Sequence, residues 1–268
     1  VLMINGSCNE QGCTYTALSE VAKVLNNEGI ETEIIQLGKA AYRDCIGCGA
    51  CRKLNNRCVF NDDIINQIIE KAEKADGFVF GSPVYYAHPS ARLQAVLDRV
   101  FYAGSSVFAF KPGAAVVSAR RAGTTASLDV INKYFTISKM PVVSSSYWNN
   151  VHGISAEQVS EDKEGLQTMR NIGHNMAWML KCIEKAKNDG IELPSAVRLC
   201  ETYAHGAVSG FTRKASSTDI QHSGGGSAVI AAYHKHRIGS VYSGQTSVGV
   251  MQLSLIHISE PTRHAQIS

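Results

Sequence analysis

The sequence predicts an α/β protein in which a five-stranded parallel sheet is covered by helices on both of its faces. Short apolar runs alternate with helical stretches throughout residues 1–194. The runs are continuously apolar, which is typical of strands that are buried on both faces. Polar turns follow the runs, at the sheet edge where such proteins bind ligands. The expected strands are residues 1–4, 32–37, 77–82, 113–119 and 141–146.

The stretches between the strands have the spacing and the ends of amphipathic helices. In the first of them, Leu18, Val21 and Leu25 recur at helical spacing, and Gly29 provides a C-terminal stop. The expected helices are residues 14–29, 61–76, 90–104, 124–139 and 164–190.

The second and third of these helices carry recognisable capping residues. Asn61 or Asp62 can cap the second helix, whose acidic start suits the positive end of its dipole. Ser90 is expected to cap the third helix, and Gly104 is expected to end it.

Composition and charge exclude several classes of function. Hydrophobic residues make up 44% of the 268, which is enough for a buried core. Residues 1–194 carry 20 basic and 20 acidic side chains. They therefore have no excess of positive charge that would indicate binding to nucleic acid or to an anionic membrane. No apolar run approaches the ~20 residues of a membrane helix, and no signal peptide is visible. We therefore expect a cytoplasmic protein, with clustered cysteines used for metal or redox chemistry.

The two ends of the chain do not follow this pattern. The first residue is Val1 rather than Met, which suggests that the start is missing. Residues 195–268 contain no sustained helical or strand period, and we expect them to be a non-native or disordered tail. Their end, residues 254–263, resembles translated sequencing-adaptor DNA. The alternative is a small second domain.

The turn after the first strand has the composition of a phosphate-binding loop. Gly6 and Gly12 let the backbone approach a ligand closely, and the following helix start adds free N–H groups. The loop lacks the Lys of a nucleoside triphosphatase and the GxGxxG pattern of a dinucleotide site. The alternative is an ordinary turn with a Thr cap. Short polar side chains are supplied by Ser7, Asn9, Thr14 and Thr16.

The turns after the third and fourth strands can hold a flat aromatic ring. Pro83 stiffens the first of them, and Val84 to Tyr86 offer an apolar wall, although these tyrosines could equally be half-buried packing. In the second turn, Gly123 and the following helix start supply N–H donors. Arg120 and Arg121 can stabilise negative charge or attract a nicotinamide cofactor's phosphates, or they can simply be solvated.

Four cysteines form a C-x2-C-x2-C-x6-C segment in which thiolates can converge on one centre. The segment consists of Cys45, Cys48, Cys51 and Cys58, with glycines that let the loop wrap around a metal. This spacing suits a [4Fe–4S] cluster, although the last gap is longer than in bacterial ferredoxins. Tetrahedral zinc would accept the same ligands, and four free thiols are the third possibility.

These motifs together resemble the NADPH-dependent FMN reductase-like branch of the flavodoxin superfamily, and the cysteine segment resembles that of its iron–sulfur flavoproteins. The resemblance covers residues 1–194. It implies a flavodoxin-like three-layer α/β/α sandwich with strand order 2-1-3-4-5, FMN as cofactor, and a homodimer or homotetramer. It places the phosphate at Ser7, Asn9, Cys13, Thr14 and Tyr15, the ring against Pro83, Val84, Tyr85, Tyr86 and Ala87, and the pyrimidine edge near Ser118, Arg120 and Gly123.

Two positions depart from the pattern of these relatives. Cys13 stands where Asn is common, so a side-chain hydrogen bond to the phosphate is lost. His88 stands where relatives often have a small residue, which alters access to the flavin.

The expected function is the transfer of electrons from NAD(P)H through FMN to a quinone, a flavin, a small oxidant or an iron–sulfur centre. The cofactor carries this chemistry, so no side chain is assigned as a catalytic acid or base. The alternatives are an electron-transfer flavoprotein that does not react with NAD(P)H, and a redox or metal sensor that uses the cysteine loop.

Overall fold

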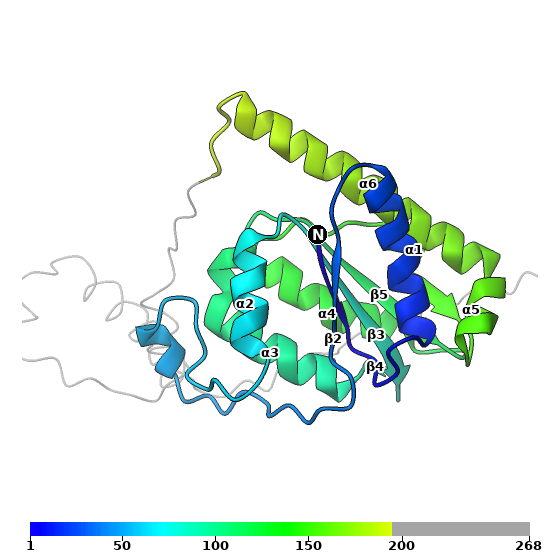
Figure 1. Cartoon of the computed structure of the whole chain (residues 1–268), viewed down its shortest axis with the longest axis horizontal. Helices are drawn as coiled ribbons and strands as arrows, with labels where there is room; N and C mark the ends of the chain where they lie inside the picture. Colours follow the sequence, from blue (N-terminus) through cyan, green and yellow to red (C-terminus); the bar gives the residue numbers. More distant parts are fainter. Residues whose placement is uncertain (195–268) are drawn as a thin grey trace, which may run out of the picture. The chain divides into compact units, whose positions relative to one another are not determined.

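The computed structural model describes residues 1–194, and the prediction for residues 195–268 lies outside this part of the chain. The fold is flavodoxin-like, as predicted. A parallel sheet in the order β2-β1-β3-β5-β6 forms the middle layer (Figure 1). Counting only the parallel strands, this is the predicted order 2-1-3-4-5. The strands are β1 (Leu2–Asn5), β2 (Glu33–Gln36), β3 (Phe78–Tyr85), β5 (Gly113–Ala119) and β6 (Asn150–His152).

Short strand β4 (His88–Pro89) lies outside this order and pairs in an antiparallel direction with the end of β3. The helices are α1 (Cys13–Asn27), α2 (Ile65–Lys74), α3 (Ala91–Phe108), α4 (Thr124–Ile137), α5 (Ala156–Glu161) and α6 (Lys163–Asn188), with a 3-10 turn η1 (Ala50–Lys53) in the cysteine segment. Within residues 1–194 no helix has the length and apolarity that crossing a membrane requires.

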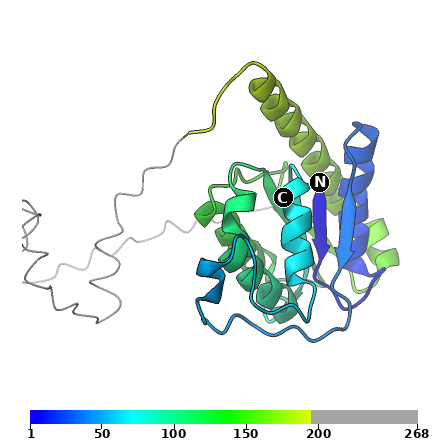
Figure 2. The same cartoon turned by 60° about the vertical axis from the view of Figure 1, so that its left-hand side comes forward.

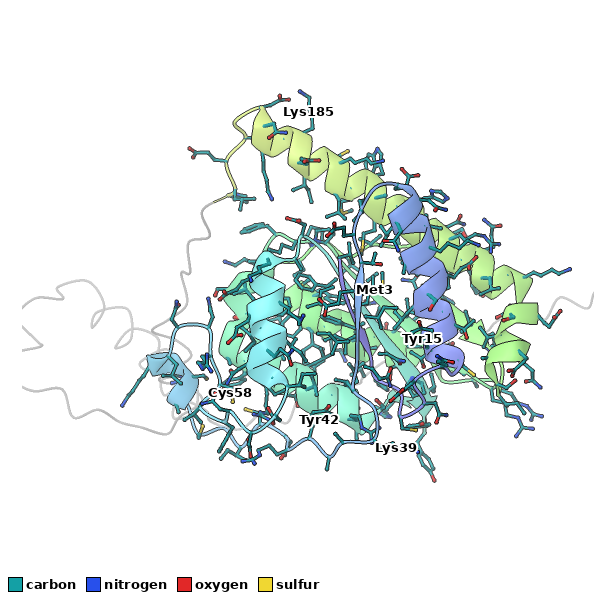
Figure 3. All side chains as sticks on the ribbon, viewed as in Figure 1. Met3, Tyr15, Lys39, Tyr42, Cys58 and Lys185 are labelled. Atoms are coloured by element: carbon teal, nitrogen blue, oxygen red, sulfur yellow. The ribbon has the colours of Figure 1, made fainter. Side chains whose placement is uncertain are left out.

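Alternate residues of the strands feed two hydrophobic cores, one on each face of the sheet. Phe78 and Phe80 of β3 pack with apolar residues of α2, α3 and α4, whereas Val79 between them packs against α1 and α6. In β1, Met3 likewise points to the α1 and α6 face, and it is completely buried (Figure 3). Figure 2 shows β1 and β2 between α1 on one side and α2 on the other. Burial on both faces explains why these strands are continuously apolar.

The fifth parallel strand was predicted at residues 141–146, and this was wrong. Residue Val142 forms only an isolated bridge with Gly113, and the paired strand follows at β6. The reason is that α6 binds the intervening serines. Asn175 Nδ2 donates to the Ser144 carbonyl at 2.8 Å, and Ser145 Oγ donates to a carbonyl of α6 at 2.7 Å. The segment is therefore drawn off the sheet edge before the chain returns at β6.

Two helix ends also differ from their predictions. α3 continues four residues past Gly104, where it has a non-helical bend. A Cβ atom at Gly104 would lie 3.0 Å from Ile69 Cγ2, so this glycine permits close packing against α2 instead of ending the helix. α2 begins at Ile65 rather than Asn61, and it is Asp63 whose carboxylate accepts the Ile65 N–H at 3.2 Å. The predicted Ser90 cap of α3 is confirmed by a 3.2 Å hydrogen bond from the Leu93 N–H.

Candidate functional site: three loops and a cysteine hollow

The loops that leave β1, β3 and β5 meet at the carboxyl edge of the sheet. Thr14, at the start of α1, and Ser118, at the end of β5, share a hydrogen bond of 2.8 Å between their hydroxyl groups. Ser90, which follows the β3–β4 hairpin, donates its hydroxyl proton to the Gly6 carbonyl at 2.8 Å. These contacts cross 104 and 84 residues of sequence, so the fold itself assembles the three turns into one place.

The loop after β1 is held rigid by hydrogen bonds from buried polar groups. The Ser7 N–H donates to Asn5 Oδ1 and the Asn9 N–H donates to Ser7 Oγ, both at 3.1 Å. From the end of β2, Gln36 Nε2 donates to the Ser7 carbonyl at 2.8 Å. Because Ser7 Oγ accepts one bond and keeps its own proton, its hydroxyl can still donate to a ligand.

The helices that start at two of these loops keep free N–H groups in their first turns. Gly12 caps α1 and Gly123 caps α4, and neither cap forms a side-chain hydrogen bond. By contrast, Ser90 caps α3. The first turns of α1 and α4 contain no acidic residue. The alternative of a Thr cap is wrong, because the cap position of α1 is occupied by Gly12 and Thr14 already lies inside the helix. Unpaired helix N–H groups favour an anionic ligand, and neither first turn adds a carboxylate of its own.

The remaining phosphate candidates lie around the start of α1. Asn9 is exposed on the loop, and Tyr15 is half-buried on the first turn of the helix (Figure 3). The Cys13 thiol donates to the Gly153 carbonyl with a sulfur-to-oxygen distance of 3.7 Å. Burial raises the pKa of the Cys13 thiol, with a further contribution from Glu157. Cys13 is therefore an uncharged neighbour for an anion.

A tight hairpin between β3 and β4 presents the aromatic residues. Tyr86 and Ala87 form its two-residue loop, with φ of 50° and 60°. Both values lie in the left-handed region that non-glycine residues rarely adopt, and such strain is concentrated at functional sites. Tyr86 is fully exposed at the tip, whereas Pro83 and Val84 before it are half-buried. His88 on β4 lies within 3.1 Å of the Tyr86 carbonyl through its Nδ1 atom.

This hairpin contacts the two neighbouring loops. Tyr85 is half exposed, and burial raises the pKa of its hydroxyl, with a smaller contribution from Cys8 of the first loop, which lies beside it. On the other side, a Cβ atom at Gly123 would lie only 2.7 Å from Ala87 Cα. The absence of a side chain at Gly123 therefore allows the hairpin and the loop after β5 to touch.

Replacing Gly123 with alanine is expected to destabilise the protein and weaken cofactor binding. Gly123 has φ of +88°, and the left-handed conformation costs an L-residue about 1–2 kcal/mol. Overpacking against Ala87 adds about 1–3 kcal/mol. Gly29→Ala is the matched control, since Gly29 has φ of +80° but no atom within 4 Å of its Cβ position. Urea unfolding and flavin titration of both variants measure the difference; equal losses would mean that the Ala87 contact is unimportant.

Arg120 and Arg121 follow β5 and are exposed. Among residues 1–194, no carboxylate forms an ion pair with either of them. Their charges thus remain available to an anionic ligand at this edge.

The four cysteines of the 45–58 segment line one small hollow against α3. Cys58 is buried, Cys48 is exposed, and Cys45 and Cys51 are half-buried. The hollow has a volume of about 20 Å³ and is completed by Arg99, Tyr102 and Ala103. Within the described residues, no three metal-ligating side chains are yet close enough to share an ion. The donor set nevertheless suits an iron–sulfur cluster, because all four cysteines of this segment line the hollow and cysteine is the residue type that ligates such clusters.

Cys58 is the most firmly held of the four. Asn66 binds both of its backbone polar groups, accepting from the Cys58 N–H at 2.8 Å and donating to its carbonyl at 3.0 Å. Arg99 Nη2 donates to Cys58 Sγ at 3.4 Å. The other three cysteines lie on a loop with left-handed glycines at Gly47 and Gly49. Binding of one cluster by all four thiols would require these three cysteines to come closer to Cys58.

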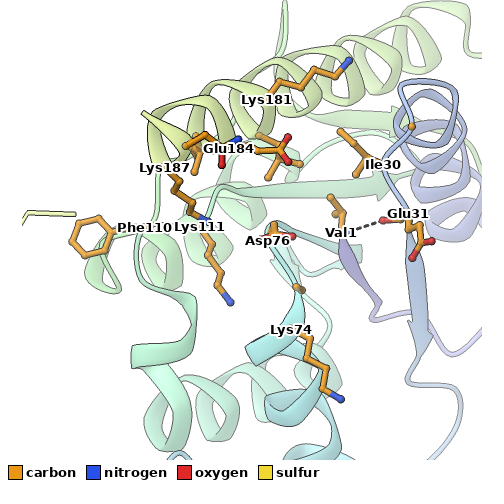
Figure 4. A pocket seen from close by; sticks show the side chains of 15 residues that line it. Val1, Ile30, Glu31, Lys74, Asp76, Phe110, Lys111, Lys181, Glu184 and Lys187 are labelled. Carbon is orange, nitrogen blue, oxygen red and sulfur yellow. Dashed lines mark hydrogen bonds between the residues drawn. The ribbon is translucent and has the colours of Figure 1, made fainter. Parts of the chain in front are cut away.

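A second and larger hollow lies at the opposite, amino edge of the sheet (Figure 4). Its volume is about 530 Å³, and it is bordered by the residues that precede β1, β3 and β5, which are Val1, Asp76 and Lys111. The Lys111 ammonium donates to the carbonyls of Ala72 and Glu73 at 2.9 and 3.1 Å, so it satisfies the end of α2. Burial lowers the pKa of Lys111. We interpret this hollow as structural.

Sequence reasoning missed the residues that support the site from a distance. Asn5 and Gln36 hold the first loop, with 2.5 Å between Asn5 Nδ2 and Gln36 Oε1, and Ser90 ties the first loop to the third strand. Arg99 was not singled out either. A polar residue that ends an otherwise apolar strand, as Asn5 does, is the signal that could have revealed one of them.

Comparison with known proteins agrees with the flavodoxin-like fold. The profile of NADPH-dependent FMN reductases matches residues 1–153. An iron–sulfur flavoprotein of Methanocaldococcus jannaschii is 33% identical over 193 residues, covering 69% of this chain and 99% of the relative. Another, from Methanosarcina thermophila, is 32% identical and covers 69% of this chain and 97% of the relative.

Among solved structures, a flavone reductase superposes with a TM-score of 0.54 at 18% identity, covering 69% of this chain and 64% of that protein, and this likeness supports the fold. The chain therefore belongs to the NADPH-dependent FMN reductase family, whose members are flavodoxin-like, FMN-dependent oxidoreductases.

Proposed function

We propose that this protein binds FMN where the three loops meet and transfers electrons from NAD(P)H through the flavin to an acceptor. The observation that carries the proposal is the pair of helix starts, α1 and α4, that have no side-chain cap and lie at one edge of the sheet. A polar loop after β1 leads into α1, and an aromatic hairpin after β3 contacts Gly123 at the start of α4. These features suit the phosphate and the ring of a flavin nucleotide.

Each of the three loops is proposed to bind a different part of FMN. The phosphate is held by N–H groups and side chains of Ser7, Asn9, Cys13, Thr14 and Tyr15. The ring packs against Pro83, Val84, Tyr85, Tyr86 and Ala87. Its pyrimidine edge faces Ser118, Arg120 and Gly123. Thr14 and Ser118 belong to different groups but share a hydrogen bond, which supports binding of the phosphate and the pyrimidine edge at neighbouring positions.

Bound FMN supplies the redox chemistry, since it accepts a hydride from a nicotinamide and releases electrons singly. The protein leaves an approach to the flavin open at the exposed hairpin tip, Tyr86 and Ala87. Arg120 and Arg121 offer charge for the nicotinamide cofactor's phosphates or for a negatively charged reduced ring. No side chain is required to move a proton from the nicotinamide.

The four cysteines are proposed to hold a [4Fe–4S] cluster that serves as a one-electron acceptor. Support comes from their common hollow and from the relatives that are named iron–sulfur flavoproteins. Helix α3 connects the two sites, because Ser90 at its start touches the first loop and Arg99 lies at the cysteine hollow. Nine residues of helix span roughly 14 Å. Quinones, free flavins and other small oxidants are the alternative acceptors.

An absorption spectrum and an anaerobic reduction test this proposal. The purified full-length chain, loaded with FMN, should show bands at about 375 and 450 nm that NAD(P)H bleaches. A protein that stays colourless with excess FMN would refute flavin binding. A flavin that is bleached only by a reduced partner protein would instead identify an electron carrier, the second candidate, which the iron–sulfur flavoprotein relatives favour.

We also propose that the chain assembles as a homodimer or homotetramer. Exposed aromatic residues support this, because Tyr147 and Trp148 are 61% and 58% exposed and border an apolar groove of about 570 Å³ with Val142. Light scattering coupled to size-exclusion chromatography measures the assembly directly.

A further inference from the structure

We propose that Arg99 is a positioning residue that fixes Cys58 and donates a hydrogen bond to its sulfur when that sulfur is a cluster ligand. The inference rests on the proposed function, because it concerns the [4Fe–4S] cluster assigned above to the four cysteines. It adds a residue outside the cysteine motif that sets the properties of the cluster.

The first step of the argument is that Arg99 is placed at the hollow by a buried network. Its side chain is 1% exposed, and its guanidinium forms a two-pronged ion pair with the Asp63 carboxylate. The Nη2 atom also reaches Cys58 Sγ at 3.4 Å. Asp63 thus fixes the plane of the guanidinium, which leaves one of its nitrogens directed at the sulfur.

The second step is that the guanidinium retains donor capacity beside the hollow. Among the described residues, Arg99 Nε has no hydrogen-bond partner although it is buried, and Arg99 lines the hollow together with all four cysteines. A buried N–H without a partner is costly. A cluster bound by the four cysteines would bring sulfur acceptors close to the guanidinium, so the unpaired buried donor supports a ligand beside Arg99.

The third step concerns the effect on the cluster. Hydrogen bonds to cluster sulfurs and nearby positive charge stabilise the more negative, reduced state, so they raise the reduction potential. Cys58 would therefore be a rigid, hydrogen-bonded ligand, whereas Cys48 on the outer loop is exposed. Because Cys58 is the cysteine that Arg99 contacts, we expect Arg99 to set the reduction potential at which the cluster accepts an electron from the flavin.

The test compares cluster potentials in anaerobically reconstituted, full-length protein. Arg99→Lys keeps the charge but loses the planar fork that reaches Asp63 and Cys58 together. We expect its cluster to be about tenfold harder to reduce, which for one electron is about 59 mV. The control is Arg43→Lys, because Arg43 also pairs with a carboxylate, that of Asp62, and lies over the Phe60 ring, but within residues 1–194 it donates no hydrogen bond to a sulfur. Its cluster potential should not change, and the FMN potential should be the same in all three proteins.

A second measurement uses only the wild-type protein, so it does not depend on whether a variant folds. Wild-type protein made with guanidinium-15N arginine should show a 15N coupling in pulsed electron paramagnetic resonance of the reduced cluster. A wild type that holds no iron would overturn the cluster and this inference together. A wild type that holds iron, shows no 15N coupling and keeps its potential in Arg99→Lys would overturn the role of Arg99 alone.

Discussion

Replacing Asn9 with aspartate is expected to weaken FMN binding at least 100-fold while leaving riboflavin binding unchanged. The substitution preserves the shape of the side chain, and Cys8 can still donate to the Oδ1 position that it contacts at 3.7 Å. It places a negative charge in the loop proposed to bind a phosphate that carries about 1.5–2 negative charges. Two unit charges 4 Å apart repel by about 1 kcal/mol in water and about 4 kcal/mol near a protein surface.

Each 1.4 kcal/mol is a factor of about ten in affinity, so repulsion of about 3 kcal/mol gives the expected loss. Riboflavin lacks the phosphate, which makes it the internal reference for an intact ring site. The matched protein control is Asn27→Asp at the other end of α1, roughly 21 Å along the helix axis. Fluorescence titration of both ligands into the three proteins provides the measurement. Equal weakening of FMN and riboflavin by Asn9→Asp would contradict a phosphate at this loop.

The sequence predicted those parts of the fold that local patterns determine. Residues 77–82 and 113–119 are buried on both faces of the sheet, so their composition alone identifies them as strands. Residues 141–146 have the same apolar start, but their course depends on Asn175 of α6, which binds Ser144. A hydrogen bond across 31 residues leaves no trace in the periodicity of the segment itself.

In the candidate site, too, the features set by local sequence patterns could be predicted and those set by distant contacts could not. The loops could be placed because each follows a strand of a parallel sheet, and the ends of such strands share one edge. The residues that support the first loop could not be predicted, because Gln36 and Ser90 bind it across 29 and 84 residues of sequence. The left-handed hairpin at Tyr86 and Ala87 was also invisible, because such turns normally carry glycine or asparagine. Arg99 lies in a helix whose apolar periodicity gives no sign that an arginine is buried there.

The burial of Arg99 leads to the largest expected effect on stability. Arg99→Met should lower the free energy of unfolding by about 3–5 kcal/mol, because it leaves the Asp63 carboxylate, only 12% exposed, without its partner. Removing both charges in Arg99→Met/Asp63→Leu should restore most of this loss, since a buried ion pair gains little over apolar packing. The control is Arg57→Met, which breaks the exposed pair with Glu70 and should cost less than about 1 kcal/mol.

Urea unfolding of these variants, together with Asp63→Leu, completes a double-mutant cycle on the cluster-free protein. A large coupling energy between the Arg99 and Asp63 substitutions would mean that the ion pair, rather than either residue alone, holds the segment from Cys58 to Asp63 against α3. Losses that simply add would show that Arg99 and Asp63 stabilise the fold separately. The cycle also separates the two roles of Arg99, because a variant that folds without either charge can still be tested for the cluster potential that the guanidinium is expected to set.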